Sequence, residues 1–396
     1  MSSTGRTERV LMIVENLPVP FDRRVWQEAQ ALRDAGYQVS VICPTGQGYE
    51  RRKEEIDGIL IYRHPLPMEG KGVMGYLVEY PAALFWQFLL AWRVFWRRGF
   101  DVIHACNPPD DIFLIGGFFK LFGKRFLFDH HDINPELYEV KFGRRDLLYR
   151  ILLFLERMTF RTADVVVSTN ESYRQIALQR GGVDPEKIFI VRSSPDLSRL
   201  KPGPPVNALR KGRTHLVGYV GVMGAQDGID ILLRIIHHII HERGRKDIQF
   251  LLIGGGTELD AMIHYAETLG LSEFVEFTGF LRGQELIDTL GSIDVGVCPD
   301  PVDCYNDKCT MNKVMEYMAL GKPLVQFDLT EGRYSAGEAA LYAQDEQDFA
   351  EKVLQLVDDA ELRKTMGEYG RQRIENELDW KYEVPKLLSA YKKVFE

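Results

Sequence analysis

Cysteine is scarce in this 396-residue chain, and its five cysteines include no pair with the C-x-x-C spacing of a metal or redox motif. Their number is odd, and most of them lie in apolar, strand-like runs. This distribution argues against a disulfide framework and against a zinc cluster, and it fits a reducing compartment. The first ten residues, "MSSTGRTERV", contain no apolar core of signal-peptide length, so we expect a cytoplasmic protein.

Two further signatures, which would mark other classes of protein, are missing. Residues 15–32, after the first apolar run, lack the G-x-G-x-x-G fingerprint of a dinucleotide site, which disfavours an oxidoreductase. The net charge is −8, with a balance of +2 over residues 1–200 and −10 over residues 201–396. Because nucleic-acid binding needs clustered positive charge, we expect no nucleic-acid partner. The nearest approach to a metal-binding carboxylate pair is "DPVD" (300–303), which we discount, so no metal is expected.

What the chain does contain is a regular alternation of apolar runs and longer stretches of helical period, such as 25–36. Most of the runs are continuously apolar, as expected for parallel strands that are covered on both faces. The strands predicted in this way are 9–14, 38–43, 58–64, 101–106, 125–131, 163–169 and 187–193, and then 215–221, 249–256, 275–280, 293–299 and 323–328.

The stretch between the two series of strands, residues 193–214, contains four prolines and shows little periodicity, which is typical of a linker. Two successive series of β–α units predict two doubly wound, Rossmann-like α/β domains, which we place at 1–200 and 201–379. Ligands of such domains bind at the carboxyl ends of the strands. Two such domains that face each other would enclose a ligand cleft.

Two glycine-rich turns follow strands of the second series. "YVGVMGAQDG" (219–228) leads from a strand into a helix, and the first N–H groups of a helix can bind an anion. "IGGG" (253–256) could approach a phosphate in the same way, but glycine also serves tight turns for purely structural reasons. The pattern leaves both interpretations open for each turn, and the candidate ligand contacts are Gly221, Gly224, Gly254 and Gly255.

Polar residues also gather at the end of a strand in the first series. In "FDHHDINPELY" (128–138), His130, His131 and Asp132 come directly after an apolar run. A histidine–aspartate pair at this position could hydrogen-bond a sugar or a phosphate, or it could simply cap the strand end.

A charged pair stands on the predicted helix within "NKVMEYMALGKPLVQFD" (312–328). Lys313 and Glu316 are three residues apart and therefore share one face of that helix. Such a pair is commonly a solvated surface pair, but the apolar neighbours favour a role in gripping a ligand. A glutamate accepts hydrogen bonds from two vicinal hydroxyls, as a ribose presents, and a lysine suits a phosphate.

One stretch of the first half is unusually aromatic. "YPAALFWQFLLAWRVFWRRGF" (80–100) holds three tryptophans and is interrupted only by Arg93 before the basic residues at its end. It is short for a membrane span and carries a charge. Either it is a core helix, or it is a surface that docks on a membrane or a lipid acceptor, near the basic cluster at 141–150.

Several segments together resemble glycosyltransferase family 4, whose members are retaining, nucleotide-sugar-dependent enzymes of GT-B fold. The similarity extends from about residue 9 to residue 345 and depends on the order and spacing of its pieces. These pieces are "PFDRRVWQEAQALRDAGYQVSVIC", "FDVIHACNPPD", "FDHHDINPE", "VVSTNES", "LIGGG", "FTGFL" and "KVMEYMALGKPLV".

The resemblance implies a role for each candidate site residue. Glu316 matches the second glutamate of the family's E-x7-E motif, which holds the nucleotide ribose, and Lys313 would lie near the diphosphate. His131, followed by Asp132, matches the histidine that reaches the donor sugar or phosphate. The turn 221–228 would back the diphosphate. Asp22 and Arg23 would line the acceptor side, and the C-terminal helix 380–396 would pack back on the first domain.

The sequence departs from the family pattern at two places. The first glutamate of E-x7-E falls at Lys308, where Asp303 or Asp307 could stand in. The turn that supplies an arginine and a lysine to the phosphates has Tyr219 and Asp227 near those positions, so that Lys313, Arg282 or backbone amides would have to compensate.

The resemblance implies a glycosyltransferase of the hexosyltransferase type that moves a sugar, with retention, from a UDP- or GDP-linked donor and needs no cofactor. We expect its acceptor to be a glycan or a lipid-linked saccharide of cell-surface or exopolysaccharide synthesis, with peripheral contact to the inner membrane face through 80–100. The alternatives are a nucleotide-sugar epimerase of the same fold, a non-catalytic nucleotide-sugar-binding subunit and, less favoured, a dinucleotide oxidoreductase.

Overall fold

The computed structural model describes residues 7–65 and 73–396, although the side chains of 73–79 are not described. The chain divides into two compact units. The first unit comprises Met1–Glu139, Gly143–Arg192 and Glu383–Glu396, and the second comprises Val140–Phe142 and Ser193–Tyr382. We describe each unit by itself.

A sheet of eight strands, in the order β3-β4-β2-β1-β5-β6-β7-β8, forms the centre of the first unit within the described residues. Its pairings are parallel except that of β3 with β4. Its strands are β1 (Arg9–Ile13), β2 (Gln38–Pro44), β3 (Lys53–Ile56), β4 (Ile59–His64), β5 (Val102–Cys106), β6 (Arg125–His130), β7 (Val165–Ser168) and β8 (Ile188–Ile190).

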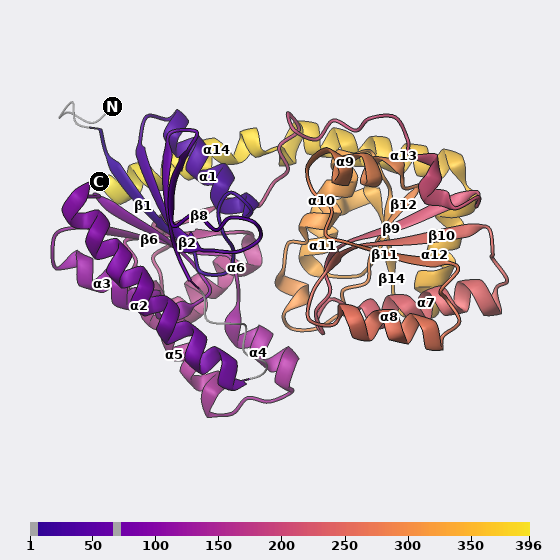
Figure 1. Cartoon of the computed structure of the whole chain (residues 1–396), viewed down its shortest axis with the longest axis horizontal. Coiled ribbons are helices and arrows are strands. Elements are labelled where there is room, and N and C mark those ends of the chain that lie inside the picture. The colour runs from indigo at the N-terminus through magenta and orange to yellow at the C-terminus, as the bar shows by residue number, and fades with distance from the viewer. Residues whose placement is uncertain (1–6, 66–72) are drawn as a thin grey trace. The chain divides into compact units, whose positions relative to one another are not determined.

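Helices cover both faces of this sheet, as the continuously apolar strands require. In Figure 1, α1 and α14 lie on one side of the sheet, and α2, α3 and α5 lie on the other. The helices of the first unit are α1 (Arg23–Asp34), α2 (Val73–Arg97), α3 (Phe113–Lys120), α4 (Asn134–Phe142), α5 (Leu147–Thr162), α6 (Glu171–Ile176) and the end of α14 (Trp380–Phe395).

The second unit has an all-parallel sheet of six strands in the order β11-β10-β9-β12-β13-β14 within the described residues. Its strands are β9 (His215–Val222), β10 (Ile248–Gly255), β11 (Val275–Gly279), β12 (Val295–Cys298), β13 (Leu324–Phe327) and β14 (Ala340–Ala343). Both sheets thus confirm the predicted doubly wound α/β class, because strand order reverses near the middle of each.

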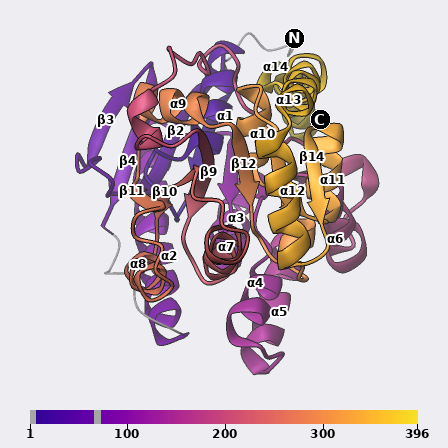
Figure 2. The ribbon, with the colours of Figure 1, turned by 90° about the vertical axis from the view of Figure 1, so that its right-hand side faces the viewer.

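The helices of the second unit form layers above and below its sheet in the views of Figures 1 and 2. α7, α8 and α12 lie on one side, and α9, α10 and α13 lie on the other. Their bounds are α7 (Ile229–His237), α8 (Leu259–Thr268), α9 (Gly283–Ser292), α10 (Asn312–Ala319), α11 (Thr330–Ala336), α12 (Glu346–Asp358) and α13 (Ala360–Arg373).

The proline-rich stretch 193–214 is not an independent linker, because it packs on the second unit. The backbone N–H of Gly203 donates to Asp288 of α9 at 2.7 Å, and that of Val206 donates to Ser292 at 2.8 Å. The division between the units therefore falls at Arg192/Ser193 rather than at the predicted 200/201.

The tail of the chain returns to the first unit. From Glu383 onward α14 belongs to that unit, where its Tyr391 lies beside Tyr37, with ring centroids 5.3 Å apart. Glu383 itself is fully buried and accepts a hydrogen bond from the backbone N–H of Arg192 at 2.9 Å.

Candidate functional site

Each unit presents a ligand-binding edge at the point where its strand order reverses. In the first unit this point lies between β1 and β5, and in the second it lies between β9 and β12. Loops that leave the carboxyl ends of the two strands at such a point separate, and the opening between them is the usual ligand site of an open α/β sheet.

Tyr317 of α10 fixes that helix at the reversal point of the second unit. β9 and β12 pair only over two residues. Beyond them, the buried Tyr317 hydroxyl accepts from Val220 N–H at 3.0 Å and lies 3.2 Å from the carbonyl oxygens of Gly218 and Val297. The phenol therefore fills the space between the diverging strands, and it places the rest of α10 over the strand ends.

Lys313, one turn earlier on α10, is held in a buried ion pair. Its Nζ lies 2.7 and 3.0 Å from the two carboxylate oxygens of Asp300, which follows β12, and 4.8 Å from the Tyr219 ring centroid. Burial alone would lower the pKa of Lys313, but the charge of Asp300 outweighs it and raises that pKa well above its usual value. The ammonium group is thus charged, and its side chain is only 9% exposed.

The glycine turn lies beside this lysine. A Cβ added at Gly221 would be 3.5 Å from Lys313 Cε and 2.7 Å from the Tyr219 hydroxyl. Asp227 closes the turn by accepting the N–H of Gly224 at 2.8 Å. Burial raises the pKa of the Asp227 carboxyl to about 6 against the opposing charge of Lys313. The structure thus brings the predicted Gly221, Gly224 and Lys313 together.

The "IGGG" turn has a structural reason for its glycines. Gly254 has φ +132°, and a Cβ there would be 1.8 Å from the carbonyl oxygen of Gly221 on the neighbouring strand. A Cβ at Gly255 would meet the Phe280 ring at 2.9 Å. The backbones of β9 and β10 approach too closely for any side chain at 254, which supports the structural interpretation of that glycine.

Glu316 is buried on α10, between Lys313 and Tyr317 in the helical repeat. Arg282, predicted to compensate at the phosphates, is exposed at the N-cap position of α9. Tyr219 does not take a phosphate-facing position. Its side chain is buried, and its hydroxyl donates to the carbonyl of Val222 at 2.6 Å.

The proposed stand-ins for the first glutamate of E-x7-E serve local structure. Asp303 accepts the backbone N–H groups of Tyr305 and Asn306 at 2.8 and 2.7 Å. Asp307 accepts the N–H of Thr330 at 2.8 Å. Lys308 donates its ammonium to the carbonyl of Cys304 at 2.5 Å. Asp303 therefore caps its own turn, and Asp307 binds the first N–H of α11.

In the first unit, Asn107 holds the turn that carries the predicted histidine and aspartate. The Oδ1 atom of Asn107, just after β5, accepts the backbone N–H groups of His131 and Asp132 at 2.9 and 3.1 Å. Its Nδ2 donates to the carbonyl of Asp132 at 2.7 Å. Asp132 in turn accepts the N–H of Ile133 at 2.8 Å, just before the first residue of α4.

A buried carboxylate orients the His131 ring. Asp129, on β6, receives Arg24 through two hydrogen bonds of 2.9 and 2.6 Å. Burial would raise the pKa of Asp129, but Arg24 and the two neighbouring histidines outweigh it and hold that pKa well below its usual value. His131 Nδ1 lies 3.3 Å from Asp129 Oδ2. Because an ionised carboxylate only accepts, Nδ1 carries a proton and Nε2 remains for another partner.

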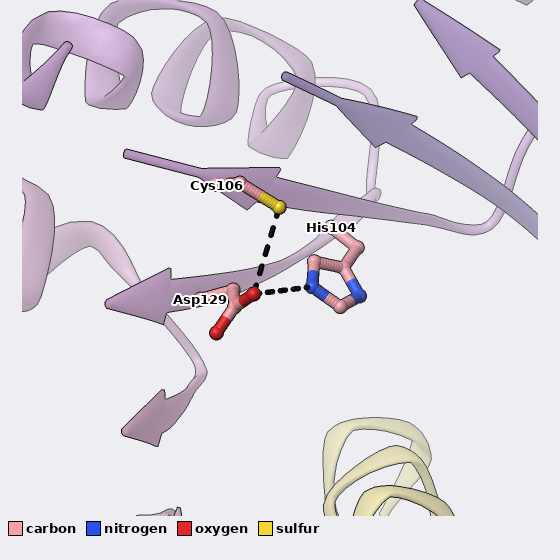
Figure 3. Close-up of side chains that lie close together, drawn as sticks. All are labelled: His104, Cys106 and Asp129. Atoms are coloured by element: carbon pink, nitrogen blue, oxygen red, sulfur yellow. Dashed lines mark hydrogen bonds and ion pairs between the residues drawn. The ribbon is translucent and has the colours of Figure 1, made fainter. Parts of the chain in front are cut away.

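Figure 3 shows His104, Cys106 and Asp129, whose ligand-type atoms lie within 4.8 Å of one another. This group has the residue types of a metal site, but its chemistry is that of a charge network. Arg24 already holds both oxygens of Asp129. Burial, with the Asp129 charge, raises the pKa of the Cys106 thiol well above its usual value.

The acceptor-side residues predicted from the resemblance lie at the start of α1. Asp22 is the N-cap of that helix and accepts the N–H of Val25 at 3.0 Å, and burial raises the pKa of its carboxyl. Arg23 is exposed. The arginine that enters the buried network is its neighbour Arg24.

Sequence reasoning missed Arg24, Asn107, Asp129, Asp300 and Tyr317. Asp129 and Asp300 could have been found, because each is a carboxylate at the end of an apolar strand, the signal already applied to His131 and Asp132. Arg24 and Tyr317 carry no such signal, since only tertiary contacts show which side of a helix their polar atoms reach.

Comparison with known proteins agrees with this architecture. Residues 22–193 match the profile of the glycosyl transferase 4-like domain, and residues 214–359 match that of glycosyl transferases group 1. Two successive Rossmann-like units of this kind are the architecture of the GT-B class. The chain belongs to glycosyltransferase family 4 and is a glycosyltransferase.

Two relatives illustrate the range of the family. The chain is 25% identical over 276 residues to the alpha-maltose-1-phosphate synthase of Mycolicibacterium smegmatis. This alignment covers 62% of this chain and 67% of that protein. It is 26% identical over 231 residues to the D-inositol 3-phosphate glycosyltransferase of Corynebacterium jeikeium, and this alignment covers 54% of each protein. The matched stretches thus span about half to two thirds of these relatives.

Solved structures resemble the whole fold. Sucrose-phosphate synthase from Thermosynechococcus elongatus superposes with a TM-score of 0.76 at 18% identity, covering 98% of this chain and 99% of that one. Anabaena HepE, solved in complex with UDP-glucose, gives a TM-score of 0.70 at 14% identity, covering 97% and 99%. At these identities the likeness establishes the fold.

Proposed function

We propose that the chain transfers a sugar, with retention at the anomeric carbon, from a UDP- or GDP-linked donor to an acceptor. The observation that carries the proposal is the geometry of α10 in a member of this family. Tyr317 anchors the helix between the diverging strands, Lys313 is a buried cation beside the glycine turn, and Glu316 follows one turn later. A nucleotide diphosphate offers matching groups, a diphosphate for the lysine and ribose hydroxyls for the glutamate.

The proposed chemistry depends on stabilising a departing diphosphate. Lys313 supplies a fixed positive charge in a partly enclosed site, where such a charge is most effective. Its present partner is Asp300, so a bound diphosphate would compete with that carboxylate. His131 has one ring nitrogen held by Asp129, and its other nitrogen would hydrogen-bond the donor sugar or phosphate. No metal or cofactor enters this scheme.

We further propose a lipid-linked saccharide as acceptor and a cytoplasmic location with contact to the inner membrane face. Several α2 side chains of the aromatic stretch are exposed, among them Phe85, Trp86 and Trp96. Within the described part of the chain, no helix combines the length and the apolar character needed to cross a bilayer.

Lys308 keeps one alternative open, a subunit that binds a nucleotide sugar without turning it over. The position expected to carry the first glutamate of the motif holds a cation that is bound to a carbonyl of its own loop. An epimerase of the same fold is a second alternative, and it would convert the nucleotide sugar without an acceptor.

The proposal is tested by calorimetry of a panel of nucleoside diphosphates with the wild type, without metal, and with Glu316→Ala. We expect one nucleotide to bind and Glu316→Ala to weaken it by about tenfold or more, because two hydrogen bonds to a charged group are lost. Glu368→Ala, an exposed position on α13, is the matched control and should bind as the wild type does. Equal binding by all three proteins would refute the ribose assignment.

Turnover then separates the alternatives. Transfer of the sugar from the bound donor to an added acceptor supports a transferase, whereas hydrolysis without an acceptor does not separate it from the epimerase. Conversion to an epimeric nucleotide sugar without an acceptor would support the epimerase, and binding without any chemistry would support the non-catalytic subunit.

A further inference from the structure

One face of α2 is apolar and exposed, with positive charges along the same line. Phe85, Trp86, Leu89 and Trp96 are between 36% and 69% exposed. Arg93 and Arg97 are exposed as well. Their spacing of three, four and seven residues puts these side chains on one side of the helix. The opposite side, with Ala83, Ala91 and Val94, is buried. Core packing thus explains one half of the aromatic stretch and leaves the other half facing outward.

α3 continues this surface. Its aromatic residues pack on α2, with Phe88–Phe118 and Trp92–Phe122 centroids 5.0 and 6.0 Å apart. Leu114 and Leu121, seven residues apart, are 51% and 82% exposed, so they share an outward side.

α5 lies next to α3 and presents the same combination of residue types. Lys120 of α3 donates to the carbonyl of Thr162 at the end of α5 at 2.9 Å. In Figure 1 the three helices cover the same side of the first sheet. The exposed side chains of α5 recur at helical spacing and are Leu147, Arg150, Ile151, Phe154, Arg157 and Arg161.

We call the exposed side chains of these helices the three-helix face. It comprises Phe85, Trp86, Leu89, Arg93, Trp96, Arg97, Leu114, Leu121, Phe122, Leu147, Arg150, Ile151, Phe154, Arg157 and Arg161.

In the part of the chain that the structure describes, few acidic side chains lie near the arginines of the three-helix face. Residues 80–100 and 112–128 contain no aspartate or glutamate, and the single acid of α5, Glu156, is buried. Within the described residues, the five arginines of the face have no ion-pair partner. Basic residues near its edge do have partners, as in Lys120–Asp164 and Arg145–Glu139. Unneutralised charge is therefore a property of the face itself.

We propose that the three-helix face docks on the surface of an anionic lipid bilayer, with its aromatic and aliphatic side chains among the headgroups and its arginines on lipid phosphates. This deepens the proposed lipid-linked acceptor and rests on that proposed function for its purpose, although the binding itself requires no catalysis. Exposed tryptophan and arginine together suit a headgroup region. A second copy of the chain fits less well, because a symmetric contact would bring the arginines together.

The test is co-sedimentation of the full chain with vesicles of phosphatidylcholine alone and of phosphatidylcholine mixed with phosphatidylglycerol. We expect binding to the mixed vesicles and a steep loss with added salt. The double variant Arg150→Glu/Arg157→Glu should lower the partition coefficient about 30-fold or more, at about fivefold for each basic residue lost. Trp96→Ser/Phe154→Ser should weaken binding as well, and that loss should not depend on salt.

The matched control is Lys246→Glu/Lys364→Glu, two exposed lysines of the second unit, which changes the net charge by the same amount. It should bind vesicles as the wild type does. Equal loss in both charge variants would show a general charge effect and overturn the proposal, as would no binding by the wild type. A monomer–dimer change on Trp96→Ser/Phe154→Ser without vesicle binding would assign the face to a second copy.

Nucleotide calorimetry on the same variants separates this inference from the proposed function. The three-helix variants should keep wild-type nucleotide binding, because their changes lie outside the strand-end sites. Vesicle binding without nucleotide binding would leave the docking face standing and remove the donor assignment. Nucleotide binding without vesicle binding would overturn the docking face and leave the donor assignment standing.

Discussion

Each unit has a buried ion pair at its strand ends. In both, a cationic side chain from a helix binds an aspartate that ends or follows an apolar strand. In the first unit the pair is Arg24–Asp129, and in the second it is Lys313–Asp300. The first pair is enclosed by further buried groups, including Glu28 and His104. The second stands beside a glycine turn, and its lysine is buried to a similar degree.

The difference shows which pair is structural and which suits an exchange of partners. Arg24 fits Asp129 with two hydrogen bonds, cannot lose its proton, and fixes the carboxylate that orients His131. Lys313 is a compact charge on a flexible stem, and an ammonium can change its acceptor or its protonation more readily. We infer that the first pair holds geometry and that the second is the one a ligand phosphate can replace.

The largest expected effect is on the first pair. Asp129→Asn should lower the free energy of unfolding by about 3–5 kcal/mol, because it removes the principal counter-charge of the buried Arg24 guanidinium and leaves only Glu28 beside it. Asp300→Asn should cost less, about 1–3 kcal/mol, since Lys313 can release its proton when its partner is lost. Urea unfolding at neutral pH measures both changes.

Arg24→Met/Asp129→Leu is the control for that comparison. Replacing both charges by apolar side chains should recover much of the loss, because both charges of the pair are removed and burial raises the pKa of the neighbouring Glu28 well above its usual value. Equal costs for Asp129→Asn and Asp300→Asn would remove the distinction between the two pairs.

A smaller effect is expected at the anchor of α10. Tyr317→Phe should cost about 1–3 kcal/mol, because the buried N–H of Val220 loses its acceptor. Thermal or urea unfolding gives the value, and Tyr334→Phe, an exposed tyrosine on α11, is the control. A neutral Tyr317→Phe would mean that the hydroxyl does not tie the helix to the strands.

The smallest expected effect depends on pH. Asp227 has a folded pKa of about 6, raised from 3.8 by burial, so its contribution to stability is fully present below about pH 4 and is lost as pH rises through about 6. Asp227→Asn cannot ionise. Between pH 4 and pH 7 the free energy of unfolding of this variant should therefore rise by about 1–2 kcal/mol relative to that of the wild type. This figure is smaller than the full pKa shift gives, because Asp227 is partly exposed to solvent.

Asp294→Asn gives the opposite sign and serves as the control. Burial would raise the pKa of Asp294, but its hydrogen bonds from Arg210 and Leu216 outweigh this and lower it. That variant should lose stability relative to the wild type as pH rises. If the stability difference between the wild type and Asp227→Asn did not change with pH, the pKa of the Asp227 carboxyl would not be perturbed.

Most of the fold was predictable from the sequence, because continuously apolar runs mark parallel strands wherever helices cover both faces. The predicted runs correspond to strands of the two sheets, but β3 and β14 were missed. β3 alternates half-buried and exposed residues on an antiparallel edge pairing, and β14 is a short edge strand.

The site was predictable only in part. Lys313, Gly221 and Gly224 meet in the second unit, and His131 lies at the strand end in the first. Their partners Asp300 and Asp129 are the residues that decide protonation and orientation, and they emerged from tertiary contacts. The sequence also could not show that the two aspartates offered in place of the first glutamate already have backbone partners. Asp303 accepts N–H groups of its own turn, and Asp307 accepts the N–H of Thr330 at the start of α11.

The sequence by itself determined the class of fold, the family and the positions of its strand-end polar clusters, because period, turn residues and motif order are local properties of the chain. The tertiary structure decided which charges are paired, which glycines allow two backbones to approach and which sides of α2 and α5 remain exposed. Those properties depend on residues distant in sequence, as with Arg24 and Asp129, whose distance and burial exist only after folding.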